Sequence, residues 1–170
     1  CQAHCGGSWR DIELLRGTER RVGFYADLAN PSRFRGNNDM TSVLIVEDDS
    51  DLLLELKDYL SAVGYHVTGA GSVEEAEQAL ASSFDLLVLD INLPDGSGLE
   101  LCQRMRPYIR SGIVMCTGRS ERELRIQSLR DGADAYLVKP VDPQELDAVL
   151  GSVHRRVVGV GKSMFRPSPL

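Results

Sequence analysis

The sequence has no apolar run that approaches the roughly 18 residues needed to span a bilayer. Its first residues also lack the charged and then apolar order of a secretory signal. Only four of the 170 residues are cysteine, and Cys102 and Cys116 lie inside apolar segments, where a reduced thiol packs as a small hydrophobic group. We therefore expect a cytoplasmic protein with no membrane span and no disulfide framework.

Two kinds of binding site are also missing from the sequence pattern. Cys1, His4 and Cys5 do not form a zinc motif, because no matching second half follows them. No apolar run is followed by a G-x-G-x-x-G or Walker-type glycine loop. These absences argue against a zinc site and against a flavodoxin-like protein that binds a nucleotide or flavin.

Charge divides the chain into three parts. Residues 40–155 contain twenty Asp and Glu against ten Lys and Arg, a net charge of −10, whereas residues 1–39 carry +1 and residues 156–170 carry +3. An acidic body repels the phosphate backbone of nucleic acid, so we do not expect it to bind DNA directly. We expect a non-native or disordered leader at 1–39, the folded domain at 40–155, and a linker or truncated start of an output domain at 156–170.

From residue 40 onward, short apolar runs alternate five times with helix-like patterns. The expected strands are Val43–Glu47, Tyr65–Ala70, Asp85–Leu89, Ile113–Cys116 and Ala135–Val138. The expected helix-capping residues are Asp49, Ser72 with Glu75, Ser120 with Glu123, and Asp142 before Pro143. Gly64 and Gly132 each follow a helix, where a left-handed residue is favoured. This alternation predicts an α/β fold, a doubly wound five-stranded parallel sheet with helices on both faces.

Reactive side chains follow four of these strands. Glu47 and Asp48 end the first strand, and Asp90, Thr117 and Lys139 follow the third, fourth and fifth. Ligands of open α/β sheets bind beyond the carboxyl ends of the strands, where the strand order reverses. With the order 2-1-3-4-5, that point lies between the first and third strands and brings the three carboxylates together.

Three neighbouring carboxylates repel one another, and a hard divalent cation relieves that repulsion. Oxygen ligands with room for water favour Mg²⁺. Lys139 adds a positive charge and Thr117 a hydroxyl donor, so an aspartate nucleophile there is well placed for phosphoryl transfer.

Four segments resemble motifs of the receiver domain of bacterial two-component response regulators: VLIVEDD, LLVLDINLPDGSG, VMCTGRS and GADAYLVKP. They occur in the family's order within residues 41–155. The resemblance implies a flavodoxin-like fold and a signalling module, rather than an enzyme, that accepts a phosphoryl group from a sensor histidine kinase. By position, Asp90 is the phosphoacceptor, while Glu47, Asp48, Asp90 and the carbonyl of Asn92 hold Mg²⁺.

The resemblance also implies a conformational switch. Thr117 matches the switch hydroxyl, Tyr136 the switch aromatic and Lys139 the phosphate-binding lysine. Their rearrangement changes the surface of the fourth helix, fifth strand and fifth helix, through which family members form phosphorylation-linked homodimers. The side chains of Asn92 and Arg119 occupy positions that tune the phosphoryl lifetime, and the resemblance favours a cis Lys139–Pro140 peptide.

The output of such a module is less closely specified. The segment PQELDAVLGSVHRR resembles the last helix of receivers that continue into a winged-helix DNA-binding domain, which implies control of transcription through a domain outside this chain. Val141, where many DNA-binding members have Phe, weakens that assignment. A stand-alone receiver that acts by protein contact remains an alternative. An aspartyl-phosphate phosphatase is a further one, although Asn92 stands where such enzymes have a second aspartate.

Overall fold

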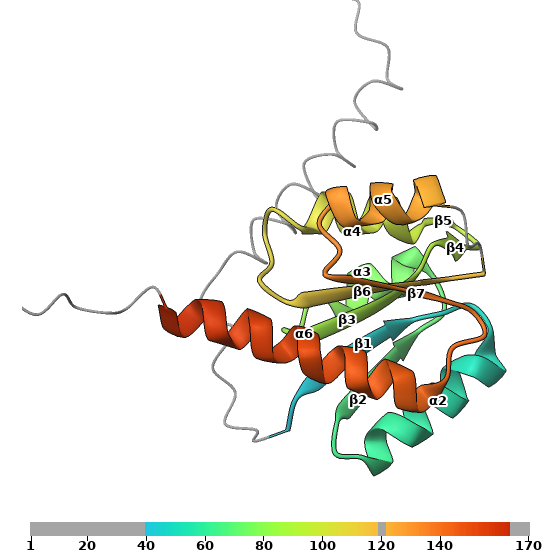
Figure 1. The fold of residues 1–170 in the computed structure, drawn as a ribbon. Helices are drawn as coiled ribbons and strands as arrows, with labels where there is room; N and C mark the ends of the chain where they lie inside the picture. Colours follow the sequence, from blue (N-terminus) through green and yellow to red (C-terminus); the bar gives the residue numbers. More distant parts are fainter. Residues whose placement is uncertain (1–39, 119–121, 164–170) are drawn as a thin grey trace, which may run out of the picture.

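A five-stranded parallel sheet forms the centre of the protein in the computed structural model, which describes residues 40–118 and 122–163 (Figure 1). In spatial order the strands are β2 (His66–Ala70), β1 (Ser42–Val46), β3 (Leu86–Asp90), β6 (Gly112–Thr117) and β7 (Ala135–Val138). The helices are α2 (Ser50–Ala62), α3 (Val73–Ala79), α4 (Gly98–Met105), α5 (Arg122–Arg130) and α6 (Pro143–Ser163). Two short antiparallel strands, β4 (Asn92–Leu93) and β5 (Gly96–Ser97), form a separate hairpin between β3 and α4.

This topology confirms the predicted doubly wound sheet of order 2-1-3-4-5. The five strands lie where they were predicted, with ends that differ by no more than one residue. The hairpin was not predicted, because strands of two residues are too short to show an alternating pattern. In the described part of the chain, no helix has both the length and the apolar character of a membrane span. The expected leader at 1–39, with Cys1, His4 and Cys5, lies outside the described residues.

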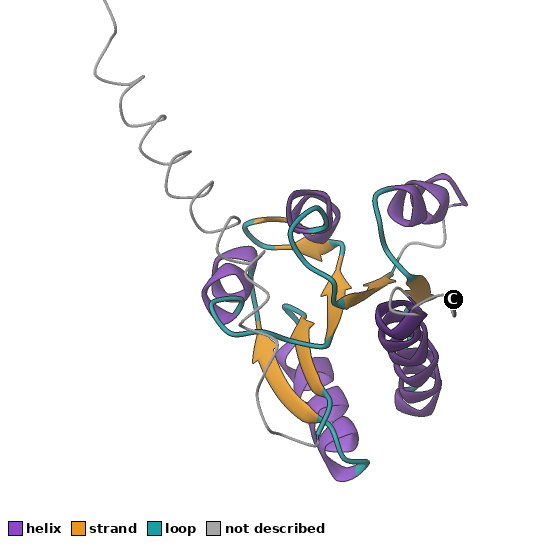
Figure 2. Ribbon diagram, turned by 90° about the vertical axis from the view of Figure 1, so that its left-hand side faces the viewer, coloured by secondary structure: helices purple, strands orange, loops and turns teal. Residues whose placement is uncertain are grey.

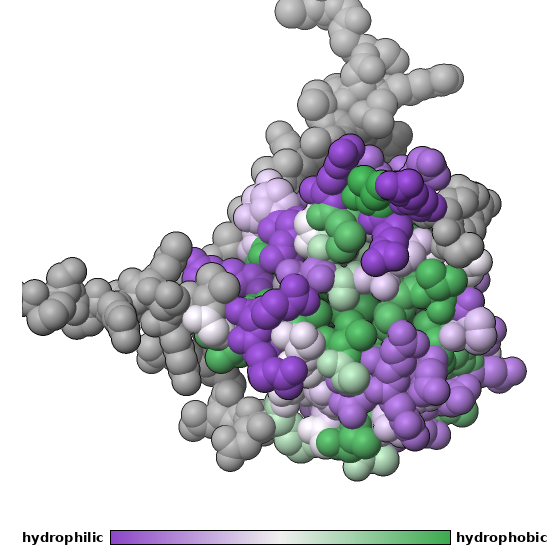
Figure 3. All heavy atoms as spheres, in the orientation of Figure 1, coloured by the Kyte–Doolittle hydropathy of each residue, from purple (hydrophilic) through white to green (hydrophobic). Residues whose placement is uncertain are grey.

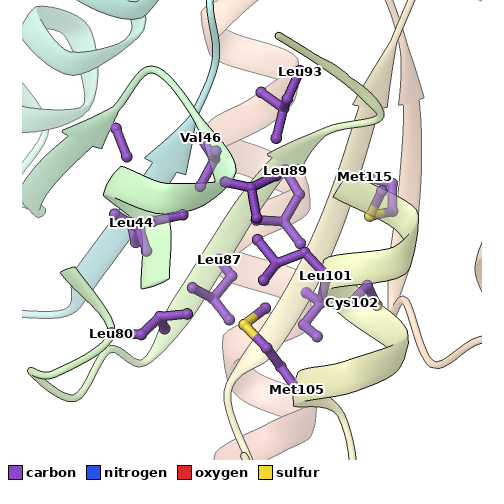
Figure 4. Close-up of a cluster of buried hydrophobic side chains, with 14 of the residues drawn as sticks. Leu44, Val46, Leu80, Leu87, Leu89, Leu93, Leu101, Cys102, Met105 and Met115 are labelled. Carbon is purple, nitrogen blue, oxygen red and sulfur yellow. The ribbon is translucent and has the colours of Figure 1, made fainter. Parts of the chain in front are cut away.

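Side chains that alternate along the central strands divide the core into two layers. The first layer contains Leu44, Val46, Leu87 and Leu89 together with Leu101 and Met105 of α4 (Figure 4). The second contains Val43, Ile45, Leu86 and Val88 together with Leu56 and Leu60 of α2 and Leu146 and Leu150 of α6. Helices therefore cover both faces of the sheet (Figure 2), and a strand buried on both faces is apolar throughout.

Helix ends follow the predicted capping pattern where the structure describes them. Asp49 accepts hydrogen bonds from the backbone N–H groups at the start of α2, at 3.0 and 3.1 Å, and the Ser72 hydroxyl caps α3 at 3.1 Å. Asp142 accepts a 2.7 Å bond from the N–H of the second residue of α6. Gly64 and Gly132 both have φ of 105°, a conformation that disfavours a side chain. The predicted pair of Ser120 and Glu123 falls partly outside the described residues.

The last helix is longer than the sequence pattern indicated. α6 continues to Ser163, past residue 155, where we placed the end of the domain. Val153 is fully buried and Val157 packs against the same layer of the core, so the apolar spacing continues along the helix. The expected boundary therefore falls inside a helix, and residues 164–170 of the predicted linker lie outside the described part of the chain.

One polar contact fastens α6 to the opposite edge of the sheet. The Tyr65 hydroxyl, just before β2, donates a 3.0 Å hydrogen bond to Oδ1 of Asp147 on α6. Burial of the phenol and this hydrogen bond to a carboxylate raise the pKa of Tyr65 from 10.0 to about 12. The neutral phenol is therefore the form that the folded protein favours.

We expect Tyr65→Phe to lower the free energy of unfolding by about 1 kcal/mol, the usual net contribution of one hydrogen bond. Because the pKa is raised in the folded state, this contribution is complete below pH 10.0 and is lost as the pH rises toward about 12. Urea unfolding of both proteins across this range measures the effect. A difference between the two proteins that stays constant up to pH 12 would contradict the assignment.

Candidate functional site

Three carboxylates meet at the carboxyl edge of the sheet. Glu47 and Asp48 follow β1, Asp90 ends β3, and β1 and β3 are neighbours at the point where the strand order reverses. One carboxylate oxygen of each residue lies within 4.8 Å of those of the other two. Glu47 and Asp90 are buried, whereas Asp48 is exposed. The structure thus brings together the three acidic residues that the strand order predicted.

Lys139 joins this group from the end of β7. Its ammonium lies 2.7 Å from Oε2 of Glu47 and 2.9 Å from Oδ2 of Asp90, so one lysine pairs with both buried acids. Its backbone N–H donates a 2.8 Å bond to the carbonyl of Thr117 on the neighbouring strand, which fixes where the side chain begins. The Lys139–Pro140 peptide is cis, as the sequence resemblance predicted.

Burial and ion pairing have opposite effects on the pKa values of Glu47 and Lys139. Burial raises the pKa of Glu47, and the nearby Lys139 only partly offsets that effect. For Lys139, burial alone would lower the pKa, but hydrogen bonds to Glu47 and Asp90 outweigh burial and raise it. The lysine therefore carries its charge at neutral pH and compensates the two acids that the fold removes from water.

The loop after β3 holds the Asp90 side chain in place. The backbone N–H of Asn92 donates a 3.2 Å hydrogen bond to Oδ1 of Asp90, while Asn92 itself is exposed on β4. The N–H of Gly98 donates a 3.0 Å bond to the carbonyl of Ile91, which folds the start of α4 back onto the end of β3. Asp90 is thus bonded on one oxygen by the lysine and on the other by its own loop.

Gly98 is a site residue that the sequence did not reveal. A Cβ at this position would clash with the backbone carbonyl oxygen of Asp90 and lie 2.9 Å from its carbonyl carbon. A side chain here would therefore displace Asp90. The only sequence signal is a glycine after a serine that caps a helix, a pattern that equally fits an ordinary turn.

The predicted switch residues lie farther along the same edge. Thr117 ends β6 and is fully buried, and Tyr136 on β7 is half-buried against the layer that faces α3 and α4. Val141, which departs from the pattern of DNA-binding members, is buried in the other layer. Arg119 lies outside the described residues, so its predicted influence on phosphoryl lifetime stays a prediction.

The donor set of this edge fits a hard cation. Three carboxylates provide oxygen ligands only, and the exposed Asp48 and Asn92 leave one side of the cluster open to water. Such donors suit Mg²⁺ or Ca²⁺, whereas no thiol or imidazole contributes to this cluster. The fold and this cluster define a class of protein, a doubly wound domain with an acidic cluster that could hold a cation and a lysine paired with two of its acids.

Comparison with known proteins assigns the family. The model of the response regulator receiver domain matches residues 43–151, so the chain belongs to that family. The chain is 40% identical over 121 residues to the transcriptional regulatory protein AruR of Pseudomonas aeruginosa, which covers 68% of this chain and 50% of AruR. The chain thus spans about half the length of the curated relatives it matches.

Solved structures agree with the assignment of the fold. A CheY-like receiver domain protein of Methanospirillum hungatei is 33% identical, with a TM-score of 0.66, and the match covers 71% of this chain and 98% of that one. A response regulator of Burkholderia pseudomallei, solved with a phosphorylated aspartic acid, a calcium ion and citrate, is 27% identical with a TM-score of 0.62. That match covers 76% of this chain and 77% of the other.

Proposed function

We propose that the domain receives a phosphoryl group from a sensor histidine kinase onto Asp90 and passes the signal on by a change of shape. The observation that carries this proposal is the pairing of Lys139 with both Glu47 and Asp90 at the strand-order reversal. In the reaction, Oδ of Asp90 forms a bond to phosphorus while the bond from phosphorus to the kinase histidine breaks, and that histidine keeps the electron pair. Lys139 neutralises phosphoryl oxygens, and Thr117 donates a hydrogen bond to one of them.

Mg²⁺ would be held by the side chains of Glu47, Asp48 and Asp90 and by the backbone carbonyl of Asn92. When bound, Mg²⁺ supplies positive charge that lowers the repulsion between the phosphoryl group and the carboxylates. The protein residues fix the acceptor: Lys139 and the Asn92 N–H each bond one of its oxygens, so the attacking carboxylate is held in a single orientation.

The proposed metal site predicts that a change of Asp48 affects Mg²⁺ binding without lowering stability. Asp48 is the exposed acid of the cluster, and Lys139 pairs with the other two acids. We expect Asp48→Asn to weaken Mg²⁺ binding by about tenfold or more, because one charge beside a divalent ion contributes well over the ~1.4 kcal/mol that tenfold requires. Without metal, the variant should be at least as stable as the wild type, since like-charge repulsion is reduced. Calorimetric titration with Mg²⁺ and urea unfolding measure the two quantities.

Asp58→Asn is the matched control, because it removes the same charge from an exposed position of α2. It should leave the Mg²⁺ affinity unchanged. Equal affinities of the wild type and Asp48→Asn would place the cation elsewhere.

The proposed output surface is the face of α5, β7 and α6, which are the fourth helix, the fifth strand of the parallel sheet and the fifth helix. Ile126 and Leu129 of α5 and Val138 of β7 are exposed hydrophobic side chains, each 38% to 43% exposed. Figure 3 shows hydrophobic residues among charged ones on this side of the molecule. We propose that Thr117 and Tyr136 rearrange after phosphorylation and that this face then forms a homodimer.

The wider role follows from the relatives. AruR is named a transcriptional regulatory protein, and we propose a cytoplasmic regulator of transcription that contacts DNA only through an output domain outside this chain. A stand-alone receiver that acts by protein contact is the second candidate. The exposed face of α5 and β7 suits either.

Incubation with acetyl phosphate and Mg²⁺ tests the proposal directly. The intact mass should rise by one phosphoryl group, and the adduct should survive acid and be lost in base, as expected of an acyl phosphate. A chelator should prevent its formation. No adduct, or sustained turnover of a phosphate ester, would overturn the signalling role and favour the phosphatase that the sequence left open.

A further inference from the structure

Asp95 connects two loops that flank the cation site. It lies in the turn of the β4–β5 hairpin, and its carboxylate accepts hydrogen bonds from the backbone N–H groups of Val73 at 2.7 Å and Glu74 at 2.9 Å. These two bonds favour the ionised carboxylate and so lower the pKa of Asp95. The contact spans 21 and 22 residues of sequence, so it is a tertiary contact rather than a local cap.

On one side, Asp95 belongs to the unit that carries Asn92. Asn92 pairs with Ser97 and Leu93 with Gly96 in the hairpin, so a displacement of Asp95 is transmitted to the Asn92 backbone. The Asn92 N–H bonds Asp90, and its carbonyl is the proposed backbone ligand of Mg²⁺. Figure 1 shows β4 and β5 beside the end of β3.

On the other side, the start of α3 adjoins the chain that carries Glu47. The Glu47 N–H donates a 2.9 Å bond to the carbonyl of Ala70, only three residues before the N–H group of Val73 that Asp95 binds. Gly71, between them, is held by a 2.7 Å bond from its N–H to the Glu75 side chain. Asp95 therefore joins the Asn92 side of the site to the Glu47 side.

Packing and one ion pair also connect the hairpin and α4 to α3. Leu93 is buried in the core layer, and Gly96 packs closely on Val73. Beyond these contacts, Arg104 of α4 forms a 3.2 Å ion pair with Glu77 of α3. The pair borders a hollow of about 550 Å³ that is also lined by Glu74, Ser97 and Glu100. The Asp95 bonds connect the hairpin itself, rather than α4, to the start of α3.

We propose that Asp95 is a positioning residue for the cation site, which fixes the Asn92 carbonyl relative to Glu47 and Asp48 by tying the hairpin to α3. This inference rests on the proposed Mg²⁺ site and adds a residue outside the cation ligands to it. Residues that orient metal ligands from outside the coordination shell typically change the affinity by about 10- to 100-fold when they are removed. Such residues usually bond a metal ligand directly, whereas Asp95 acts through the backbone of the hairpin.

The test compares Asp95→Ala with Ser72→Ala in the whole chain, with Mg²⁺ as the probe. Both variants remove a cap from the first turn of α3, but the Ser72 hydroxyl bonds Glu75 within that helix and does not reach the hairpin. We expect Asp95→Ala to weaken Mg²⁺ binding about tenfold and Ser72→Ala to leave it unchanged. Asp95→Asn, which retains one acceptor oxygen, should give an intermediate affinity.

Hydrogen exchange of the metal-free proteins provides a second measurement. The amide of Asn92 should exchange faster in Asp95→Ala and at the wild-type rate in Ser72→Ala. Unchanged Mg²⁺ affinity in Asp95→Ala, or equal loss in both alanine variants, would overturn this inference alone and leave the proposed function standing. A wild-type protein with no Mg²⁺ affinity would overturn the cation site itself, and this inference with it.

Discussion

Asp90→Asn is expected to take up no phosphoryl group from acetyl phosphate and Mg²⁺, whereas the wild type takes up one. Asp90 is a buried acid at the end of β3 with one oxygen on Lys139 and the other on the Asn92 N–H. The amide of asparagine keeps the size of the side chain and an oxygen for hydrogen bonding. It lacks the negative charge of the nucleophile, so the covalent step fails while the fold persists. Intact-mass measurement after incubation gives the result.

Asp142→Asn is the control for this loss. Asp142 follows β7 at the same edge of the sheet and caps α6, a role that asparagine fills equally well. This variant should be phosphorylated like the wild type. An adduct that persists in Asp90→Asn would move the acceptor to another residue.

Gly98→Ala should have the largest effect on the fold among single changes near the site. The added methyl group would clash with the Asp90 carbonyl, and the hydrogen bond from the Gly98 N–H to the Ile91 carbonyl prevents α4 from moving away freely. The contacted oxygen and carbon of Asp90 belong to the backbone, and the position of a Cβ is fixed by its own backbone, so no side-chain rotation relieves the contact. We expect a loss of about 3 kcal/mol in the free energy of unfolding, at the upper end of overpacking costs. Phosphorylation should also slow, since the acceptor moves with its backbone.

Gly159→Ala is the matched substitution with the opposite expected sign. Gly159 is an exposed position of α6 where an added Cβ meets nothing within 4 Å. Alanine there should raise the free energy of unfolding by up to about 1 kcal/mol, the difference in helix propensity. Urea unfolding of both variants measures the two free energies of unfolding. An unchanged free energy of unfolding in Gly98→Ala would contradict the prediction and show that the chain relaxes around Asp90.

The sequence predicted which side chains would lie together, because a parallel sheet converts chain order into spatial neighbourhood. Glu47, Asp90, Thr117 and Lys139 each follow a strand, and strands of one direction end at one edge. The strand order alone was therefore enough to predict that these four residues lie close together. The bond of Lys139 to two acids at once depends on side-chain reach and burial, which a strand assignment does not contain.

Other features depend on contacts between distant segments. The need for glycine at 98 arises from the approach of α4 to the Asp90 carbonyl, and the Asp95 bonds arise from the approach of the hairpin to α3. Each residue, seen in the sequence, fits an ordinary turn. The length of α6 was missed for another reason, because Gly159 and the following glycine resembled a linker although Val153 and Val157 continue the apolar face.

Locating the phosphoryl group tests the central claim most directly. The phosphorylated protein would be reduced with borohydride, which converts an aspartyl phosphate to homoserine, and its peptides would be sequenced by mass spectrometry. We predict homoserine at residue 90 and unmodified Glu47, Asp48 and Asp95. Reduction at any other acid, or a phosphoryl group on a histidine, serine or threonine, would contradict the account.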